Sequence, residues 1–160
     1  MRQALPDPLL AWRLAVAMAL ATLVTGALAQ GPLPTLRLQV AGHPLKVEVV
    51  STFEQRAVGL MFREKLGAND GMLFLYEDPG YQSMWMKNTL IPLSVAFIDS
   101  GGRILNIADM EPRTLDSHLS AGPALYAIET NRGWFAQRRI KPGDKVTGLP
   151  KPPDPTKGRP

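Results

Sequence analysis

The chain has 160 residues, a formal net charge of +4 and no cysteine. The lack of cysteine excludes a disulfide framework, a thiolate nucleophile and a cysteine-ligated metal, and the modest charge does not demand a nucleic acid partner. A chain of this length can bury one hydrophobic core without cross-links, so we expect a single domain.

The first 29 residues are typical of a secretory signal peptide. Two arginines within the first 13 residues precede the apolar run "LAVAMALATLVTGALA" (14–29). The run is shorter than the roughly 20 residues that a spanning helix needs, and Ala-Leu-Ala at 27–29 fits a cleavage site. The sequence therefore predicts export to a periplasmic or extracellular location, with no membrane insertion after signal cleavage. An uncleaved anchor is the alternative.

The predicted domain spans residues 30–148 and begins with a hairpin and a helix. Hydrophobic residues alternate on both sides of a turn in "LRLQVAGHPLKVEVVST" (36–52), which is typical of a β-hairpin. Thr52 and Gln55 stand at the spacing of a capping box and predict the start of a short amphipathic helix. Gly59 weakens this helix, so we expect another segment to pack closely over it.

The rest of the domain is expected to consist of short strands and one more helix. A turn at Gly101 and Gly102 predicts a tight hairpin, and Asn131 is expected to cap a helix over "RGWFAQRR". A closing strand is expected after the turn at Pro142 and Gly143. The other predicted strands are "MLFLY" (72–76), "YQSMWMKN" (81–88), "LSVAFIDS" (93–100), "RILNIADM" (103–110) and "ALYAIET" (124–130).

These elements predict an α+β fold: a small, mostly antiparallel, barrel-like β-sheet with two short helices. The pattern shows no βαβ alternation, which argues against a doubly wound sheet. Residues 149–160 are rich in proline and poor in apolar side chains, so we expect a disordered tail there. A proline-rich docking segment is the alternative for the tail.

The stretch "MWMKNTLIPL" (84–93) carries the clearest candidate site. In an extended segment, Trp85 and Lys87 point to one side and Met84, Met86 and Asn88 to the other. We expect the methionines to pack on the core, while the tryptophan, the lysine and the nearby Thr89 line a groove. A flat ring beside a mobile cation suits a polar or carbohydrate-like ligand, or an acidic one. The alternative is that Trp85 is a core residue.

Three charged residues complete the predicted ligand-binding set. Glu129 ends an apolar strand, where a carboxylate is costly unless a partner meets it. The expected partners are Lys87, Arg56 or the amides of the following helix. Arg56 and Arg63 are expected to add positive charge from the first helix.

The stretches "TFEQRAVGLMFREKL", "DGMLFLY", "MWMKNTLIPLSVAFIDSGGRI" and "AIETNRGWF", followed by "IKPGDKV", closely resemble the family called domain of unknown function 192. The resemblance covers about Leu36 to Val146. It implies a small single domain with a mixed β-barrel-like fold, often exported. It implies no settled activity, cofactor or substrate.

The sequence thus predicts an exported binding or accessory domain of the cell envelope rather than an enzyme. We expect it to be a monomer without a metal or other cofactor. One alternative is a hydrolase of envelope polysaccharide that uses Glu129, which requires a second carboxyl group within roughly 5 to 10 Å. Another alternative is Cu(I) binding by methionine thioethers, which is chemically suited to an exported chain without cysteine. Methionines beside leucine and phenylalanine are more often core filler.

Overall fold

A computed structural model describes residues 31–152 of the chain. The predicted signal peptide and residues 153–160 of the predicted tail lie outside the described residues. All elements below belong to the unit that begins at Leu33. Its elements, in chain order, are β1 (Thr35–Val40), β2 (His43–Val50), α2 (Phe53–Val58), β3 (Asp70–Gly80), β4 (Ser83–Met84), β5 (Leu93–Ile98), β6 (Ile104–Met110), β7 (His118–Leu119), β8 (Ala124–Asn131), α3 (Trp134–Gln137) and β9 (Val146–Thr147).

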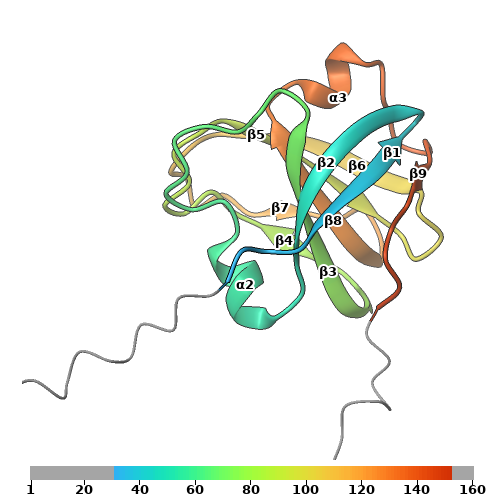
Figure 1. Ribbon diagram of the computed structural model, residues 1–160, viewed down its shortest axis with the longest axis horizontal. Coiled ribbons are helices and arrows are strands. Elements are labelled where there is room, and N and C mark those ends of the chain that lie inside the picture. Colours follow the sequence, from blue (N-terminus) through green and yellow to red (C-terminus); the bar gives the residue numbers. More distant parts are fainter. Residues whose placement is uncertain (1–30, 153–160) are drawn as a thin grey trace, which may run out of the picture. The chain divides into compact units, whose positions relative to one another are not determined.

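Seven of the strands form one curled sheet with the order β6-β5-β8-β3-β2-β1-β9, and β4 pairs with β7 in a separate ribbon. Figure 1 shows the sheet curving around its own interior, with α2 and α3 at opposite ends. The prediction of a barrel-like sheet with two short helices is therefore confirmed in its outline.

The sheet is mixed, because five of its six strand pairings are antiparallel and one is parallel. β2 and β3 run parallel, with Lys46 opposite Asp70 and Val50 opposite Phe74. A parallel pair needs a long crossover, and residues 51–69, which include α2, provide it. The sequence pattern did not reveal this β–α–β connection because α2 has only six residues and a long irregular segment follows it.

The two edges of the curled sheet approach each other near β9. This strand pairs with β1, while the segment just before it bonds to the start of β6. The Ile104 amide donates to the Asp144 carbonyl at 2.9 Å, and the Val146 amide donates to the Gly102 carbonyl at 2.8 Å. The closing strand expected after Pro142 and Gly143 is thus confirmed.

Each face of the sheet carries its own hydrophobic cluster. One cluster joins side chains such as Leu38, Val47 and Ile128 with Trp134 and Phe135 of α3. The other joins Met72, Phe74, Val95 and Phe97 with Leu60, Met84 and Met86 from segments that cover this face. Because opposite sides of the same strands are buried, β5 and most of β8 lack the polar alternation of a surface strand.

Local signals in the sequence account for several elements. The predicted hairpin is the β1–β2 pair, and the turn at Gly101 and Gly102 joins β5 to β6. The capping box is confirmed, because the Thr52 hydroxyl accepts from the Gln55 amide while the Gln55 side chain accepts from the Thr52 amide. These contacts fix the start of α2.

Two predicted elements differ from the structure. Only Ser83 and Met84 of the expected strand 81–88 pair with another strand, because the chain turns where the Thr89 amide bonds to the Met86 carbonyl and Asn88 takes a φ of 55°. The cap of α3 is Gly133 rather than Asn131. Asn131 ends β8, and its side-chain amide donates to the Leu66 carbonyl at 3.2 Å.

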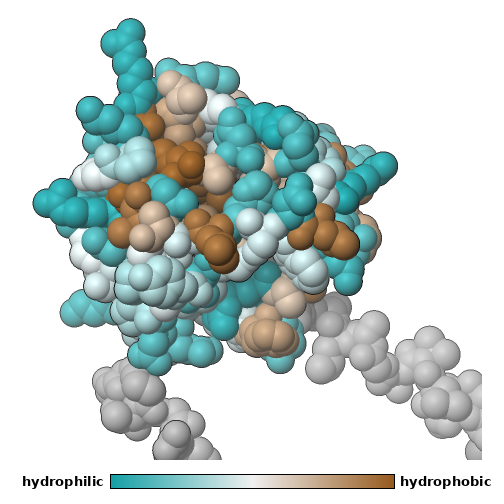
Figure 2. All heavy atoms as spheres, turned by 180° about the vertical axis from the view of Figure 1, so that it is seen from behind, coloured by the Kyte–Doolittle hydropathy of each residue, from teal (hydrophilic) through white to brown (hydrophobic). Residues whose placement is uncertain are grey.

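Apolar side chains also reach the surface. Figure 2 shows them gathered among polar residues on the face seen from behind. The large apolar residues with exposed side chains include Phe53, Val58, Phe62, Tyr81 and Trp85. Within residues 31–152, no helix combines the length and the apolar character needed to span a bilayer.

Candidate functional site

A pocket of about 390 Å³ lies where α2, β3, β4 and β8 meet. Its volume falls within the range of small-molecule sites, and most of its lining is apolar or aromatic, as in such sites. The lining residues are Phe53, Arg56, Ala57, Val58, Gly59, Leu60, Met61, Phe74, Tyr76, Gln82, Ser83, Met84, Trp85, Thr89 and Glu129. We call this the Glu129 pocket.

Glu129 is the most unusual residue of the pocket. Its cross-strand neighbours are Met72 in β3 and Val95 in β5, so its side chain shares a face with apolar residues. The residue is only 4% exposed, and no hydrogen bond joins its carboxyl group to any other residue in the range 31–152. Burial raises the pKa of Glu129 to about 8. A carboxyl group therefore lies in the wall of an otherwise largely apolar pocket with its proton retained at neutral pH.

Tyr76 lies near Glu129 in the same pocket. Its hydroxyl donates to the Met84 sulfur at 3.6 Å, which links β3 to β4. Burial, followed by the charge of Glu129, raises the pKa of Tyr76 to about 12, whereas Arg56 acts in the opposite direction. The phenol is therefore neutral over the physiological range.

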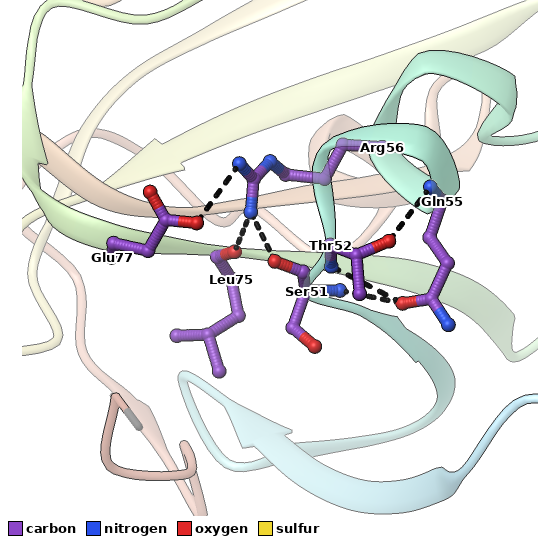
Figure 3. A network of polar contacts seen from close by, with 6 residues as sticks. All are labelled: Ser51, Thr52, Gln55, Arg56, Leu75 and Glu77. Atoms are coloured by element: carbon purple, nitrogen blue, oxygen red, sulfur yellow. Dashed lines mark hydrogen bonds and ion pairs between the residues drawn. The ribbon is translucent and has the colours of Figure 1, made fainter. Parts of the chain in front are cut away.

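Arg56 extends from α2 to the backbone around it. Its guanidinium donates to the Leu75 carbonyl at 2.9 Å and to the Ser51 carbonyl, and it lies 3.7 Å from the Glu77 carboxylate (Figure 3). The group also lies over the Tyr76 ring, with 5.3 Å between the guanidinium carbon and the ring centroid. Arg56 thus joins α2 to β3 and fixes one wall of the pocket.

Trp85 and Lys87 lie on the exposed side of the segment after β4. Trp85 is 49% exposed, and the Lys87 ammonium lies 5.3 Å from the centroid of its ring. Met84 and Met86 point the other way and are buried. The expected division of this segment into a core side and an outer side is confirmed for these four residues. Thr89 is buried, and its hydroxyl donates to the Lys87 carbonyl at 3.4 Å.

The structure brings together only part of the predicted ligand-binding set. Arg56, Trp85, Thr89 and Glu129 all line the pocket, and Lys87 reaches the ring of Trp85. Asn88 is exposed and does not line the pocket.

Arg63 also lies elsewhere, in a second depression of about 430 Å³ near the start of β3. Its Nη1 atom lies 2.7 Å from Oε1 of Glu48. Arg63 and Glu48 therefore form an ion pair. Although this second depression is slightly larger, it lacks a buried carboxyl group without a partner, so we place the candidate site at the Glu129 pocket.

Three other acidic residues that lie at or near strand ends are not part of the pocket lining. Asp99 accepts from the Arg103 amide at 2.8 Å, and Asp109 accepts from the Ser94 hydroxyl at 2.5 Å. Glu111 pairs with Arg132 at 2.6 Å. Among the lining residues, Glu129 is the single carboxyl group. The two-carboxylate arrangement of glycoside hydrolysis therefore has one member in the pocket.

The methionines have two different surroundings. Met61 and Met84 line the pocket, whereas Met72, Met86 and Met110 are fully buried. These three belong to the same hydrophobic cluster as Phe74 and Phe97. Their surroundings are those of core-filling side chains.

Sequence reasoning missed several lining residues. Tyr76 could have been found from alternation along the predicted strand 72–76, which places Met72, Phe74 and Tyr76 on one face. In the structure, Glu129 lies opposite Met72 on this face. Phe53 and Leu60 had no comparable signal, since their position depends on how the crossover from β2 to β3 folds back over the sheet.

The family model of domain of unknown function 192 (DUF192), described as "Uncharacterized ACR", matches residues 36–148. The chain belongs to this family. The resemblance seen in the sequence motifs is thereby confirmed. No curated protein matches the chain.

Two solved structures of high similarity extend this result. A protein of unknown function from Novosphingobium aromaticivorans DSM 12444 is 38% identical, with a TM-score of 0.69, over 74% of this chain and 93% of that chain. A protein from Sinorhizobium meliloti 1021, provisionally described as a transcription regulator, is 32% identical, with a TM-score of 0.71, over 74% of this chain and 96% of that chain. The DUF192 domain of this protein therefore shares its fold with both.

Proposed function

We propose that this protein is a ligand-binding domain of the cell envelope and that its ligand occupies the Glu129 pocket. The observation that carries the proposal is the carboxyl group of Glu129, which faces the pocket although no group within residues 31–152 hydrogen-bonds to it. Burial of a carboxyl group is costly because it removes much of the hydration of the group. A bound ligand would reduce this cost by forming a hydrogen bond with the carboxyl group.

The pocket walls favour a ligand with both apolar and polar parts. Trp85 presents half of its surface at the rim, where a flat molecular face can stack on it. Thr89, Gln82 and Ser83 offer hydrogen-bonding groups on the same lining. A ring with an apolar face and polar substituents, as in a sugar, fits this combination.

Binding is favoured over hydrolysis because Glu129 has no second carboxyl group beside it among the lining residues. The cellular setting of the proposal rests on the sequence: the signal-like segment at 1–29 supports export to a periplasmic or extracellular location. We further propose that the exported domain acts as a monomer on a small polar ligand or envelope component, not on nucleic acid.

A thermal-shift screen of the protein purified after export tests binding. The compounds are envelope sugars with and without free amino groups, peptidoglycan fragments, acidic metabolites and Cu(I). A ligand at 100 times its Kd stabilises the folded state by roughly 2.7 kcal/mol. We expect the shift to disappear in Trp85→Ala and to persist in Phe62→Ala, which removes an exposed aromatic ring outside the pocket lining.

The outcomes of this screen separate the candidate functions. A shift that survives Trp85→Ala and Glu129→Gln would place the ligand elsewhere and contradict the proposal. A shift with Cu(I) that is lost in Met84→Leu would favour the thioether alternative. Sequencing the N-terminus of the exported protein tests the setting, because cleavage of the signal peptide leaves Gln30 as the first residue.

A further inference from the structure

We propose that the ligand group that meets Glu129 is a protonated amine carried on an apolar or ring-shaped body. This inference rests on the proposed ligand-binding function and names the chemistry of the ligand. Three features carry it: the unpaired carboxyl group, the cations already held by aromatic rings of the pocket, and the apolar lining.

The first feature is the missing counter-charge. Within residues 31–152, the ion pairs join Arg56 to Glu77, Arg63 to Glu48 and Arg132 to Glu111, so none of them includes Glu129. Without a counter-charge the buried carboxyl group keeps its proton, because an isolated ionised group would lose its hydration without compensation. An ammonium group of a ligand would supply both the charge and the hydrogen bonds that this carboxyl group lacks.

The second feature is the cation affinity of the pocket's aromatic rings. Tyr76 holds the guanidinium of Arg56, and Trp85 holds the ammonium of Lys87, both at 5.3 Å from the ring centroid. The face of an aromatic ring is electron-rich and attracts cations, most strongly in tryptophan. The contact of the chain's own lysine therefore shows that the ring of Trp85 can hold an ammonium group.

The positive charges of Arg56 and Lys87 do not prevent a cationic ligand from binding in the pocket. The charge of Arg56 is met by the Glu77 carboxylate and by the carbonyl groups of Ser51 and Leu75. Lys87 is exposed and has a flexible stem, so it can leave Trp85 when a ligand arrives.

The number of protons released on binding follows from the protonation state of Glu129. Because burial raises the pKa of Glu129 to about 8, the carboxyl group is protonated at neutral pH. When a protonated amine binds, Glu129 gives its proton to solvent and the carboxylate forms an ion pair with the ammonium. One proton is thus released for each ligand bound, and affinity rises with pH up to about 8.

The other titratable or charged groups of the site are Tyr76 on β3, Arg56 on α2 and Lys87 at the rim. The pKa of Tyr76 is about 12, so its phenol keeps its proton across this range. The lining contains no histidine. A proton released near pH 7 on binding therefore reports Glu129.

The test uses three probes that share a benzene ring and differ in charge: benzylamine, benzyl alcohol and benzoate. Calorimetry in two buffers of different ionisation enthalpy gives the Kd and the number of protons released. We expect benzylamine to bind at least about tenfold more tightly than benzyl alcohol at pH 8. As pH rises towards 8, the Kd of benzylamine should fall by up to about tenfold per pH unit, with release of one proton for each molecule bound.

Two variants assign the effect to its residue. Glu129→Gln should remove the advantage of benzylamine over benzyl alcohol and the release of a proton. Glu64→Gln removes an exposed carboxylate outside the pocket lining and should leave both intact. If Glu129→Gln does not fold, the pH profile of the unmodified protein still decides the question.

The outcomes separate this inference from the proposed function. Binding of benzyl alcohol or benzoate as tight as that of benzylamine, or binding of benzylamine that does not depend on pH, would overturn the inference but leave a ligand-binding pocket. Failure of all three probes, together with no thermal shift from any sugar, would overturn both.

Discussion

The guanidinium of Arg56 lies over the ring of Tyr76, with 5.3 Å between the guanidinium carbon and the ring centroid. This contact couples α2, which has no buried residue of its own, to β3. One side chain therefore holds the helix that forms a wall of the Glu129 pocket.

Replacing Arg56 should destabilise the protein more than its single ion pair suggests. Arg56→Ala leaves the Leu75 and Ser51 carbonyls without their donor and removes the contact with Tyr76, so we expect the free energy of unfolding to fall by about 2 kcal/mol. Glu77→Gln breaks only the exposed ion pair and should cost less than about 1 kcal/mol. Urea denaturation of both variants measures the difference, and equal losses would show that the ion pair carries the effect.

Glu129 should make stability fall as pH rises. The unfolded carboxyl group ionises near its ordinary pKa of 4.5, whereas the folded one keeps its proton up to about 8. Between these values the folded state binds more protons, so its free energy of unfolding decreases with rising pH. Relative to the unmodified protein, Glu129→Gln should gain on the order of 3 kcal/mol between pH 5 and pH 8.

Denaturation of the unmodified protein and Glu129→Gln at both pH values measures this gain. The comparison cancels the other titrating groups, which both proteins share. A difference between the two proteins that does not change with pH would mean that Glu129 is ionised in the folded state.

Gly59 should resist substitution for two separate reasons. Its φ is +48°, which L-residues rarely adopt, and an added Cβ would lie 3.1 Å from Cζ of Phe74. The close approach confirms the expectation that another segment packs over this glycine. We expect Gly59→Ala to cost about 2 kcal/mol.

Gly42→Ala is the matched control, because it also has a positive φ but no atom within 4 Å of the added Cβ. Thermal denaturation of both alanine variants separates strain from packing. A cost at Gly59 no larger than that at Gly42 would show that Phe74 moves aside easily.

Adjacent residues in the "MWMKN" stretch should respond in opposite ways to truncation. Met86 is fully buried, so Met86→Ala should cost about 2 to 5 kcal/mol of stability. Trp85 is half exposed, so Trp85→Ala should cost less than about 1.5 kcal/mol while abolishing ligand binding. If Trp85→Ala unfolds the protein, the rim of the pocket is instead part of the core.

Local signals made much of the fold predictable. The capping box at Thr52 and Gln55 and the glycine turn between β5 and β6 each depend on residues close together in the chain. The same holds for the opposite orientations of Trp85 and Met86, which follow from the alternation of an extended backbone.

Features that depend on distant segments were harder to predict. The parallel pairing of β2 and β3 requires the crossover 51–69 to fold over the sheet, and no local pattern marks that path. The placement of Arg63 beside Glu48, outside the pocket, has the same origin, because the crossover leaves the pocket after Met61.

Glu129 was predictable as an anomaly but not in its surroundings. A carboxylate at the end of an apolar strand indicated a partner, and Arg56 and Lys87 were the expected side chains. In the structure Arg56 bonds to Glu77 and to backbone carbonyls, and Lys87 lies over Trp85. The carboxyl group of Glu129 therefore faces the pocket. This could not be predicted from the sequence, because it depends on where the side chains of Arg56 and Lys87 lie in three dimensions.

The measurement that tests the Glu129 pocket most directly is a titration of the isotope-labelled protein with glucosamine and with benzylamine, followed by amide NMR signals. The account predicts that the largest shifts cluster at Gly59, Tyr76, Trp85 and Glu129. Shifts centred on Lys46, Arg63 and Asp70 in the second depression, or no shifts with either compound, would contradict it.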